Sequence, residues 1–327
     1  MAVQEITEAV DLCLPNGRLN REAVGFSRGP LHRSNLHGWG RNKRWDYWGI
    51  VSPRYVLGMT VVSLDYAHAS QLYLYDRESG RAMTADSTSI GPGDVLIPDE
   101  LPPLVVMEDN HKAKLRFLDE SGQTVLKAST KHVSAHLLVE PGGDSLGAVV
   151  PWSDRRFQYT LKQLARPVSG TITVDDTEIE LDPAESFAVL DRGRGKWPYK
   201  MSWNWAAGSG IVDGKRLGLQ LGGRWTKGTG VTENGLFVDG RLSYWDDELD
   251  WNYNIAEKSS PWQVRGENVD ATLTPFHRRH ASSNVGIIAS STYQAFGVWS
   301  GFAVDADGVR HRLDGLTGWA EQAKNRW

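Results

Sequence analysis

The residues best suited to chemistry lie in two charged, glycine-rich runs, residues 191–199 and 222–235. The first run places Asp191 beside the cations Arg192 and Arg194. Neighbouring cations pull the pKa of a carboxyl group down, so this run predicts a catalytic carboxylate or a salt-bridged network. Alternatively, the salt bridges have no catalytic role and only hold two domains together.

The second run combines glycines, which let backbone approach a ligand closely, with several polar side chains. A glycine-rich β-turn would explain the same residues without a function. Neither the Walker pattern nor G-x-G-x-x-G occurs there, which excludes a phosphate loop. Between the runs, a strand through Trp203 and Trp205 would point both indoles to one face and form an aromatic wall.

We expect the two runs and this strand to converge on one cavity near the junction of two barrels. A hairpin that begins at Trp203 and turns at Asp213-Gly214 would return the chain to the start of that strand. The candidate catalytic residues are Asp191, Arg194 and Glu233, and the candidate ligand-binding residues are Trp197, Tyr199, Trp203, Asn204, Trp205, Arg224, Trp225 and Asn234.

Two other motifs are weaker. The segment 143–147 fits G-x-S-x-G, but a nucleophile elbow needs a following helix, and Pro151 comes soon after. His132 and His136 would lie roughly 13 Å apart along a strand, too far to chelate one metal ion unaided. We therefore expect no metal site and no cofactor.

The elements that position these residues are predicted to be strands. Hairpin turn signals recur, among them Asp213-Gly214, Asn234-Gly235 and Asp239-Gly240. The runs between them are short and rich in β-branched and aromatic residues, among them Tyr55–Ser63, Ala113–Phe117 and Val133–Val139. In the second of these, apolar residues alternate with charged ones. The exception is the tail, Leu316–Trp327, where the spacing of Trp and Ala predicts a helix of about three turns.

The length and composition of the chain indicate the number of domains, the kinds of partner and the cellular compartment. A chain of 327 residues suggests two domains, and we place the join near Pro198, giving residues 1–198 and 199–327. A formal net charge of -4 argues against nucleic acid as a partner. No apolar run is long enough to span a membrane, and the start does not read as a secretory signal. The single cysteine, Cys13, allows no internal disulfide, so we expect a cytoplasmic protein; a homodimer is left open.

The sequence resembles the bacterial domain-of-unknown-function 2804 family over essentially its whole length. The matching stretches are residues 25–30, 43–48, 191–205, 222–240 and the terminal run 318–327. A more remote resemblance is to the double-lipocalin group that includes the carotenoid 1,2-hydratases. The resemblance implies an all-β fold of two lipocalin-like (calycin) antiparallel barrels, here with the predicted C-terminal helix.

The hydratase group carries an Asp-His-x-Trp-Gly segment followed by a Trp-Asp-Trp strand. In this sequence Asp191, Trp203 and Trp205 match that pattern, but Arg192 replaces the His and Asn204 replaces the middle Asp. Hydration of an alkene needs a proton donor, so both departures count against hydratase chemistry specifically.

Two classes of function remain open. The first is a cofactor-independent enzyme of hydro-lyase, isomerase or cyclase type, acting on a lipophilic or ring-containing small molecule. The second is a non-catalytic carrier of such a molecule, and a saccharide-binding protein is a further alternative. Four charged residues near the junction favour the enzyme, because a carrier of lipophilic molecules gains nothing from burying charge: Asp191, Arg194, Arg224 and Glu233. Convergent titratable groups in the cavity would favour catalysis, and a dry apolar pocket would favour carriage.

Overall fold

The computed structural model describes residues 3–91, 95–120, 122–286 and 288–326. The chain divides into two compact units between Lys196 and Trp197, two residues before the predicted join. The N-terminal unit is Ile6–Lys196, and the C-terminal unit is Trp197–Trp327 together with the first residues of the chain up to Glu5.

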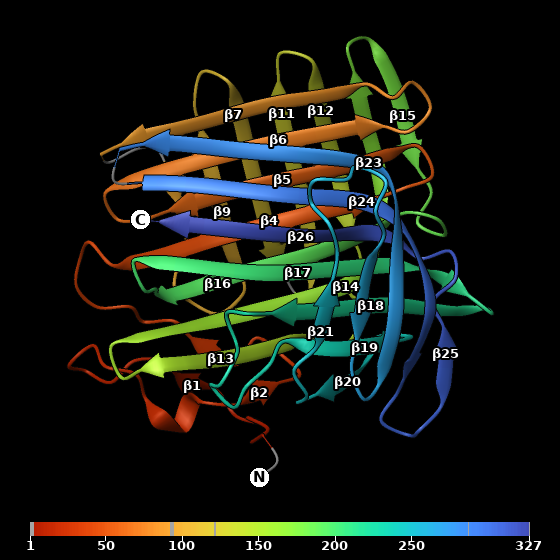
Figure 1. Cartoon of the computed structure of the whole chain (residues 1–327). Coiled ribbons are helices and arrows are strands. Elements are labelled where there is room, and N and C mark those ends of the chain that lie inside the picture. The colour runs from red at the N-terminus through yellow and green to blue at the C-terminus, as the bar shows by residue number, and fades with distance from the viewer. Residues whose placement is uncertain (1–2, 92–94, 121, 287, 327) are drawn as a thin grey trace. The chain divides into compact units, whose positions relative to one another are not determined.

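Strands make up nearly all the regular structure of the N-terminal unit, and Figure 1 labels most of them. One short 3-10 helix, η1 (Arg21–Ala23), occurs near the start. The strands are β1 (Val10–Asp11), β2 (Phe26–Ser27), β3 (His32–Arg33), β4 (Asn42–Val51), β5 (Tyr55–Ser63), β6 (Ala67–Asp76), β7 (Ala82–Ile90), β8 (Val95–Leu96), β9 (Leu104–Asp109), β10 (Ala113–Glu120), β11 (Gln123–Thr130), β12 (Val133–Val139), β13 (Leu146–Ser153), β14 (Arg156–Val174), β15 (Thr177–Leu181) and β16 (Phe187–Lys196).

The main sheet of this unit is antiparallel, with neighbours in the order β7-β6-β5-β4-β16-β14-β12-β11-β10-β9-β8. The long strand β14 carries a register shift between Gln163 and Arg166, where Ala165 has a φ of 50°. A bulge of this kind bends a strand and increases its twist. Before the bulge β14 pairs with β13, and after it with β12 and β15, so the sheet curls around one core.

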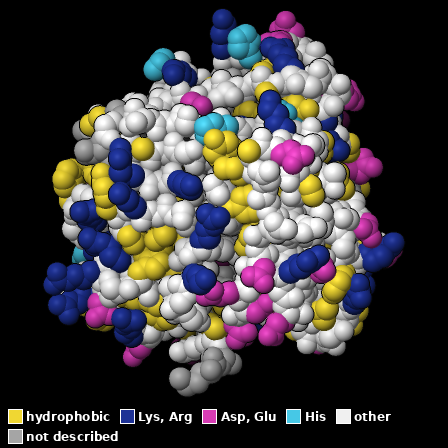
Figure 2. All heavy atoms as spheres, in the orientation of Figure 1, with side chains coloured by type: hydrophobic (Ala, Val, Ile, Leu, Met, Phe, Trp, Pro, Cys, Tyr) yellow, Lys and Arg dark blue, Asp and Glu magenta, His cyan; other side chains and the backbone are white. Residues whose placement is uncertain are grey.

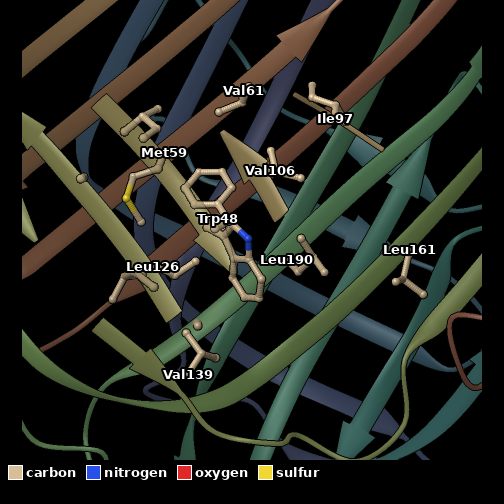
Figure 3. Packing of buried hydrophobic residues seen from close by; sticks show 14 of the residues in the cluster. Trp48, Met59, Val61, Ile97, Val106, Leu126, Val139, Leu161 and Leu190 are labelled. Carbon is tan, nitrogen blue, oxygen red and sulfur yellow. The ribbon is translucent and has the colours of Figure 1, made fainter. Parts of the chain in front are cut away.

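Buried residues alternate with more exposed ones along several strands of the N-terminal unit, and these buried positions form part of its core. On β10, for example, Ala113, Leu115 and Phe117 are buried while the residues between them are exposed or half-buried. Figure 3 shows Trp48 among apolar side chains from several strands, including Val106 and Leu190. Because these side chains come from strands distant in sequence, burying them fixes the register of the sheet.

The C-terminal unit is a second curled antiparallel sheet, with the order β20-β19-β18-β17-β26-β24-β23-β22-β21 and β25 paired to β24. Figure 1 shows β17, β26, β24 and β23 running alongside one another. Its strands are β17 (Lys200–Val212), β18 (Lys215–Gly223), β19 (Asn234–Val238), β20 (Arg241–Trp245), β21 (Asp250–Asn252), β22 (Trp262–Arg265), β23 (Val269–Val285), β24 (Ile288–Val304), β25 (Arg310–Arg312) and β26 (Thr317–Arg326).

The all-β fold with two curled antiparallel half-barrels confirms the predicted fold class. The predicted C-terminal helix is wrong, because residues 317–326 form β26, a central strand between β17 and β24; residue 327 lies outside the described residues. The predicted turn at Asn234-Gly235 is also wrong, since both residues begin β19. The Asp213-Gly214 turn is confirmed, with φ values of 51° and 76° that a two-residue hairpin loop requires.

Charged side chains of both signs are interspersed on the face drawn in Figure 2, as the near balance of acidic and basic residues requires. None of the helical segments described is of a length and apolarity that would carry the chain across a membrane.

Candidate functional site

Four charged side chains are buried inside the N-terminal unit. We call Asp46, Asp119, Arg192 and Arg194 the charged layer. Arg192 Nε lies 2.9 Å from Asp46 Oδ2, and its Nη2 lies 3.2 Å from Asp119 Oδ2. Arg194 Nη2 lies 2.8 Å from Asp46 Oδ1. Asp46 therefore joins the two arginines, and Arg192 joins the two carboxylates.

Strand register explains how residues so distant in sequence meet. Asp46 on β4 is the direct cross-strand partner of Arg192 on β16, and Arg194 is one alternation further along the same face. Asp119 continues the inward-facing series of Phe117 on β10. The layer thus occupies successive core positions of three strands.

Burial and ion pairing have opposite effects on the pKa values of the two arginines in the layer. Burial alone would lower the pKa of Arg192, but Asp46 and Asp119 outweigh this and raise it. Burial also lowers the pKa of Arg194, and Asp46 offsets only part of that effect. Transfer of an unpaired charge into such an interior is prohibitive, so the layer persists because its charges are paired.

Two buried donors near the layer have no hydrogen-bond partner among the described residues, the hydroxyl of Tyr159 and the indole nitrogen of Trp48. Tyr159 on β14 is the cross-strand partner of Arg194. Burial raises the pKa of Tyr159, although Arg192 and Arg194 oppose the shift, so the phenol keeps its proton. An unpaired buried donor costs about 1–3 kcal/mol, which marks these atoms as candidates for contact with a ligand.

A cavity of about 190 Å³ adjoins the charged layer. Asp119 lines it and at the same time pairs with Arg192, so the cavity has a direct electrostatic connection to the layer. Three further charged side chains, Arg28, Asp144 and Arg166, also line it. This volume suits a single ring, since a cavity of about 150 Å³ admits benzene.

Arg166 serves mainly to build the wall of this cavity. Its Nε donates to the carbonyl of Glu140 at 2.7 Å, and its Nη2 donates to the carbonyl of Gly122 at 2.7 Å. Its guanidinium also lies 5.6 Å from the centre of the Trp48 ring. Burial lowers the pKa of Arg166 to about 10, and the residue stays protonated at neutral pH. These bonds hold the loops beside the β14 bulge in place.

In the C-terminal unit, four of the predicted residues come together. Trp197 stacks on Trp225 with ring centres 5.6 Å apart and meets Trp203 edge-on at 5.6 Å. Trp225 Nε1 donates to Glu233 Oε1 at 2.7 Å. A Cβ at Gly222 would lie 2.3 Å from Glu233 Cγ, so glycine there is what lets Glu233 pack. The hairpin expected to deliver Trp225 to the start of β17 is present.

Asn204 and Arg224 meet elsewhere in the same unit, at the hydroxyl of Tyr253. Asn204 Nδ2 lies 3.0 Å and Arg224 Nη2 lies 2.7 Å from that oxygen, which in turn donates to Gln322 at 2.7 Å. Alternation along β17 puts Asn204 on the face opposite Trp203 and Trp205. The predicted residues of this unit therefore divide between two faces of one strand.

The remaining predicted residues have separate surroundings. Trp205 Nε1 donates to Gln220 at 2.9 Å. Asn234 accepts a hydrogen bond from the backbone N–H of Gly222 at 2.7 Å and donates to the carbonyl of Asp247. The side chain of Tyr199 is exposed.

Asp191 lies on β16 but points away from the charged layer. Its Oδ1 lies 2.8 Å from Lys162 Nζ and 3.3 Å from Thr160 Oγ1. Odd and even positions of a strand face opposite sides, so Asp191 and Arg194 do not share a face of the sheet. The convergence of residues 191–196 with residues 224–233, which belong to different units, stays a prediction.

Sequence reasoning missed Asp46, Asp119 and Tyr159. Asp119 belongs to an Asp-Glu-Ser-Gly segment typical of a turn, and Asp46 and Asp119 lie 146 and 73 residues from Arg192, so no local pattern links either carboxylate to that arginine. A carboxylate at an inward position of an alternating strand was the available signal for Asp119. Within the described part of the chain, no three His, Cys, Asp or Glu side chains are grouped so as to hold a metal ion.

Other proteins of known structure share this all-β fold. Kievitone hydratase from Nectria haematococca aligns over 88% of this chain and 89% of its own, with 11% identity and a TM-score of 0.54. CghA with Sch210972 aligns over 88% of each chain, with 11% identity and a TM-score of 0.54. At such identities the likeness shows the fold. The search of curated proteins found no match. The chain belongs to the family described as domain of unknown function 2804, whose model matches residues 3–327.

Proposed function

We propose that this protein is a cofactor-independent enzyme of hydro-lyase, isomerase or cyclase type, whose substrate is a lipophilic or ring-containing small molecule. The observation that carries the proposal is the position of Asp119, a carboxylate that lines a cavity of about 190 Å³ while it pairs with buried Arg192. Proton transfer, which hydro-lyase reactions, many isomerisations and acid-catalysed cyclisations require, needs a titratable group at the cavity wall.

The charges around Asp119 suit it to act as a base. Arg192 Nη2 lies 3.2 Å from Asp119 Oδ2 and holds the carboxylate in one position at the cavity wall. Asp46 holds Arg192 from its other side, so the guanidinium is positioned before any ligand enters. Tyr159, the cross-strand partner of Arg194, keeps its proton and is the group that we would test as the acid.

A non-catalytic carrier is the alternative. Arg28, Asp119, Asp144 and Arg166 line the cavity beside apolar residues, and titratable groups that converge on a cavity favour catalysis over simple carriage. In the C-terminal unit, the indole donors of Trp203 and Trp225 are already used in hydrogen bonds within that unit. We retain a ligand-binding role for those indoles, and a catalytic role for Asp191, Arg194 and Glu233, as proposals for mutagenesis.

Deuterium incorporation distinguishes catalysis from carriage without a known substrate. The purified protein would be incubated in D₂O with a small-molecule extract of its host, and products followed by mass spectrometry. An enzyme that moves protons onto carbon leaves non-exchangeable deuterium in one compound, and Asp119→Asn should abolish this. A carrier would enrich a compound on the protein with its mass unchanged, and that result would reject the proposal.

A further inference from the structure

A second cavity of the N-terminal unit, about 280 Å³ in volume, has five cations and no carboxylate among the described residues that line it. It shares no lining residue with the cavity at Asp119. We call it the basic cavity. Its charged lining residues are Arg18, Arg41, Arg155, Arg156 and Lys196.

Four separate segments bring these cations together. Arg18 comes from the turn after β1, and Arg41 from the loop before β4. Arg155 and Arg156 lie at the β13–β14 turn, where the Ser153 hydroxyl accepts hydrogen bonds from both backbone N–H groups. Lys196 ends β16 and donates to the carbonyl of Gly17 at 3.0 Å.

None of the five cations forms an ion pair with a carboxylate in the part of the chain that the structure describes. The neighbouring carboxylates are used elsewhere. Asp154 pairs with Arg21, and Asp65 pairs with Arg44 at 3.3 Å. Asp65 also accepts hydrogen bonds from the backbone N–H groups of Gly40 and Asn42, at 2.7 and 3.0 Å. These hydrogen bonds from Gly40 and Asn42 hold in place the loop that lines the cavity.

The cations are close enough to repel one another. Burial lowers the pKa of Arg156, and the charges of Arg41 and Arg155 lower it further. Burial likewise lowers the pKa of Lys196, while Cys13 and Asp65 raise it and Arg156 and Arg44 lower it. Burial raises the pKa of Cys13 to about 11, so its thiol brings no negative charge at neutral pH. Like charges gathered around a hollow are destabilising unless an anion enters.

Trp39 adds an aromatic surface to the wall of the same cavity. It belongs to the loop that carries Arg41, and 76% of its surface is exposed. Its ring and that of Tyr66 form a T-shaped pair with 6.4 Å between the ring centres. An exposed indole beside arginines is suited to stacking on a flat ring.

We propose that the basic cavity binds a phosphate group carried on a ring-containing small molecule, with the arginines on the phosphate and Trp39 against the ring. Arginine forks match phosphate oxygens in pairs, and a phosphate monoester carries about two negative charges at pH 7. A carboxylate would bring one charge only. The site is independent of the enzyme function proposed for the Asp119 cavity.

Calorimetric titration of the full chain at fixed ionic strength tests this, with inorganic phosphate, phenyl phosphate and benzoate as probes. We expect inorganic phosphate to bind, phenyl phosphate to bind more tightly, and benzoate to bind at least about tenfold more weakly than phenyl phosphate. Benzoate binding as tight as phenyl phosphate would overturn the assignment to phosphate.

The variants separate the two halves of the site. Arg41→Ala with Arg155→Ala should weaken both phosphate probes by at least about tenfold, with the melting temperature kept or raised because repulsion is relieved. Trp39→Ala should leave inorganic phosphate unchanged and reduce phenyl phosphate to the same affinity. Lys127→Ala, an exposed cation on β11 of the same unit, is the matched control. Equal weakening by Lys127→Ala would show nonspecific attraction and reject the site.

Discussion

Replacing Asp46 with Asn would test whether the charged layer depends on this one carboxylate. Asp46 is fully buried and pairs with both Arg192, at 2.9 Å, and Arg194, at 2.8 Å. Asp46→Asn keeps the volume but removes the charge, so Arg194 is left with backbone carbonyls as its acceptors. Breaking a buried pair costs about 3–5 kcal/mol, and in a unit of this size each kcal/mol lowers Tm by about 2–4 °C. The expected fall in Tm is therefore about 6–20 °C.

Two further variants make the measurement specific. Asp119→Asn leaves Arg192 with Asp46, so we expect a smaller cost of about 1–3 kcal/mol together with loss of any proton-transfer activity. Asp154→Asn removes the same charge from an exposed pair with Arg21 and should cost about 1 kcal/mol or less. Urea unfolding and calorimetry would measure all three. If Asp46→Asn melted no lower than Asp154→Asn, the account of the layer as mutually dependent buried charges would be refuted.

The remaining predictions concern pH, thiol reactivity and the acidic residues flagged in the sequence. Burial lowers the pKa of His32 to about 4, so the ring is neutral in both states above pH 6.5; between pH 6.5 and 4 only the unfolded chain binds the proton, and the free energy of unfolding should fall by about 3 kcal/mol. Urea titrations at pH 7 and 4.5 should show that His32→Gln lacks this component. Cys13, whose pKa burial raises to about 11, should react with a disulfide reagent at pH 8 roughly a hundredfold more slowly than a free thiol; an equal rate would contradict its burial. Asp191→Asn should lower Tm, because it leaves buried Lys162 without its 2.8 Å partner. Glu233→Gln should keep the acceptor for Trp225, so any loss of turnover measured in that variant would report on charge rather than folding.

The sequence was sufficient for several short strands that are rich in β-branched or aromatic residues and lie between turn signals. Alternation predicts the core positions of Ala113–Phe117, and the runs Tyr55–Ser63 and Val133–Val139 match β5 and β12 in full. Asp213-Gly214 was readable because few residue pairs adopt positive φ at two successive positions. These features depend on near neighbours in the chain, which is why they could be predicted.

The tail was mispredicted because β26 is buried on both faces. Residues 318–323 are all buried, so the strand shows no alternation between apolar and polar residues. A Cβ at Gly318 would lie 1.9 Å from the carbonyl oxygen of Ala207, which shows how closely β17 approaches. Small residues that permit this packing, such as Ala320 and Ala323, are also strong helix formers. Local pattern alone does not separate the two cases.

The candidate site was only partly predictable for a different reason. Arg192 and Arg194 were recognised as a cationic run, but their partners lie 146 and 73 residues away from Arg192 in sequence. Which carboxylates they meet depends on the β4–β16 register and on the position of β10, and neither leaves a local signal. Strand alternation, by contrast, was enough to place Trp203 and Trp205 on one face.

The N-terminal unit contains two kinds of charged site: in the charged layer the charges are paired, and among the described residues of the basic cavity they are not. In the charged layer every guanidinium faces a carboxylate, so the layer is stable without a ligand and can hold Asp119 in one position. In the basic cavity five cations line one hollow without a carboxylate partner among the described residues, so that site gains stability only when an anion enters. A catalytic carboxylate benefits from the first arrangement, since preorganised charge avoids reorganisation during proton transfer. A binding site for an anion benefits from the second, because relief of repulsion adds to the affinity. Loss of the Asp119 carboxylate should therefore affect turnover and leave phosphate binding intact, and loss of Arg41 and Arg155 should do the reverse.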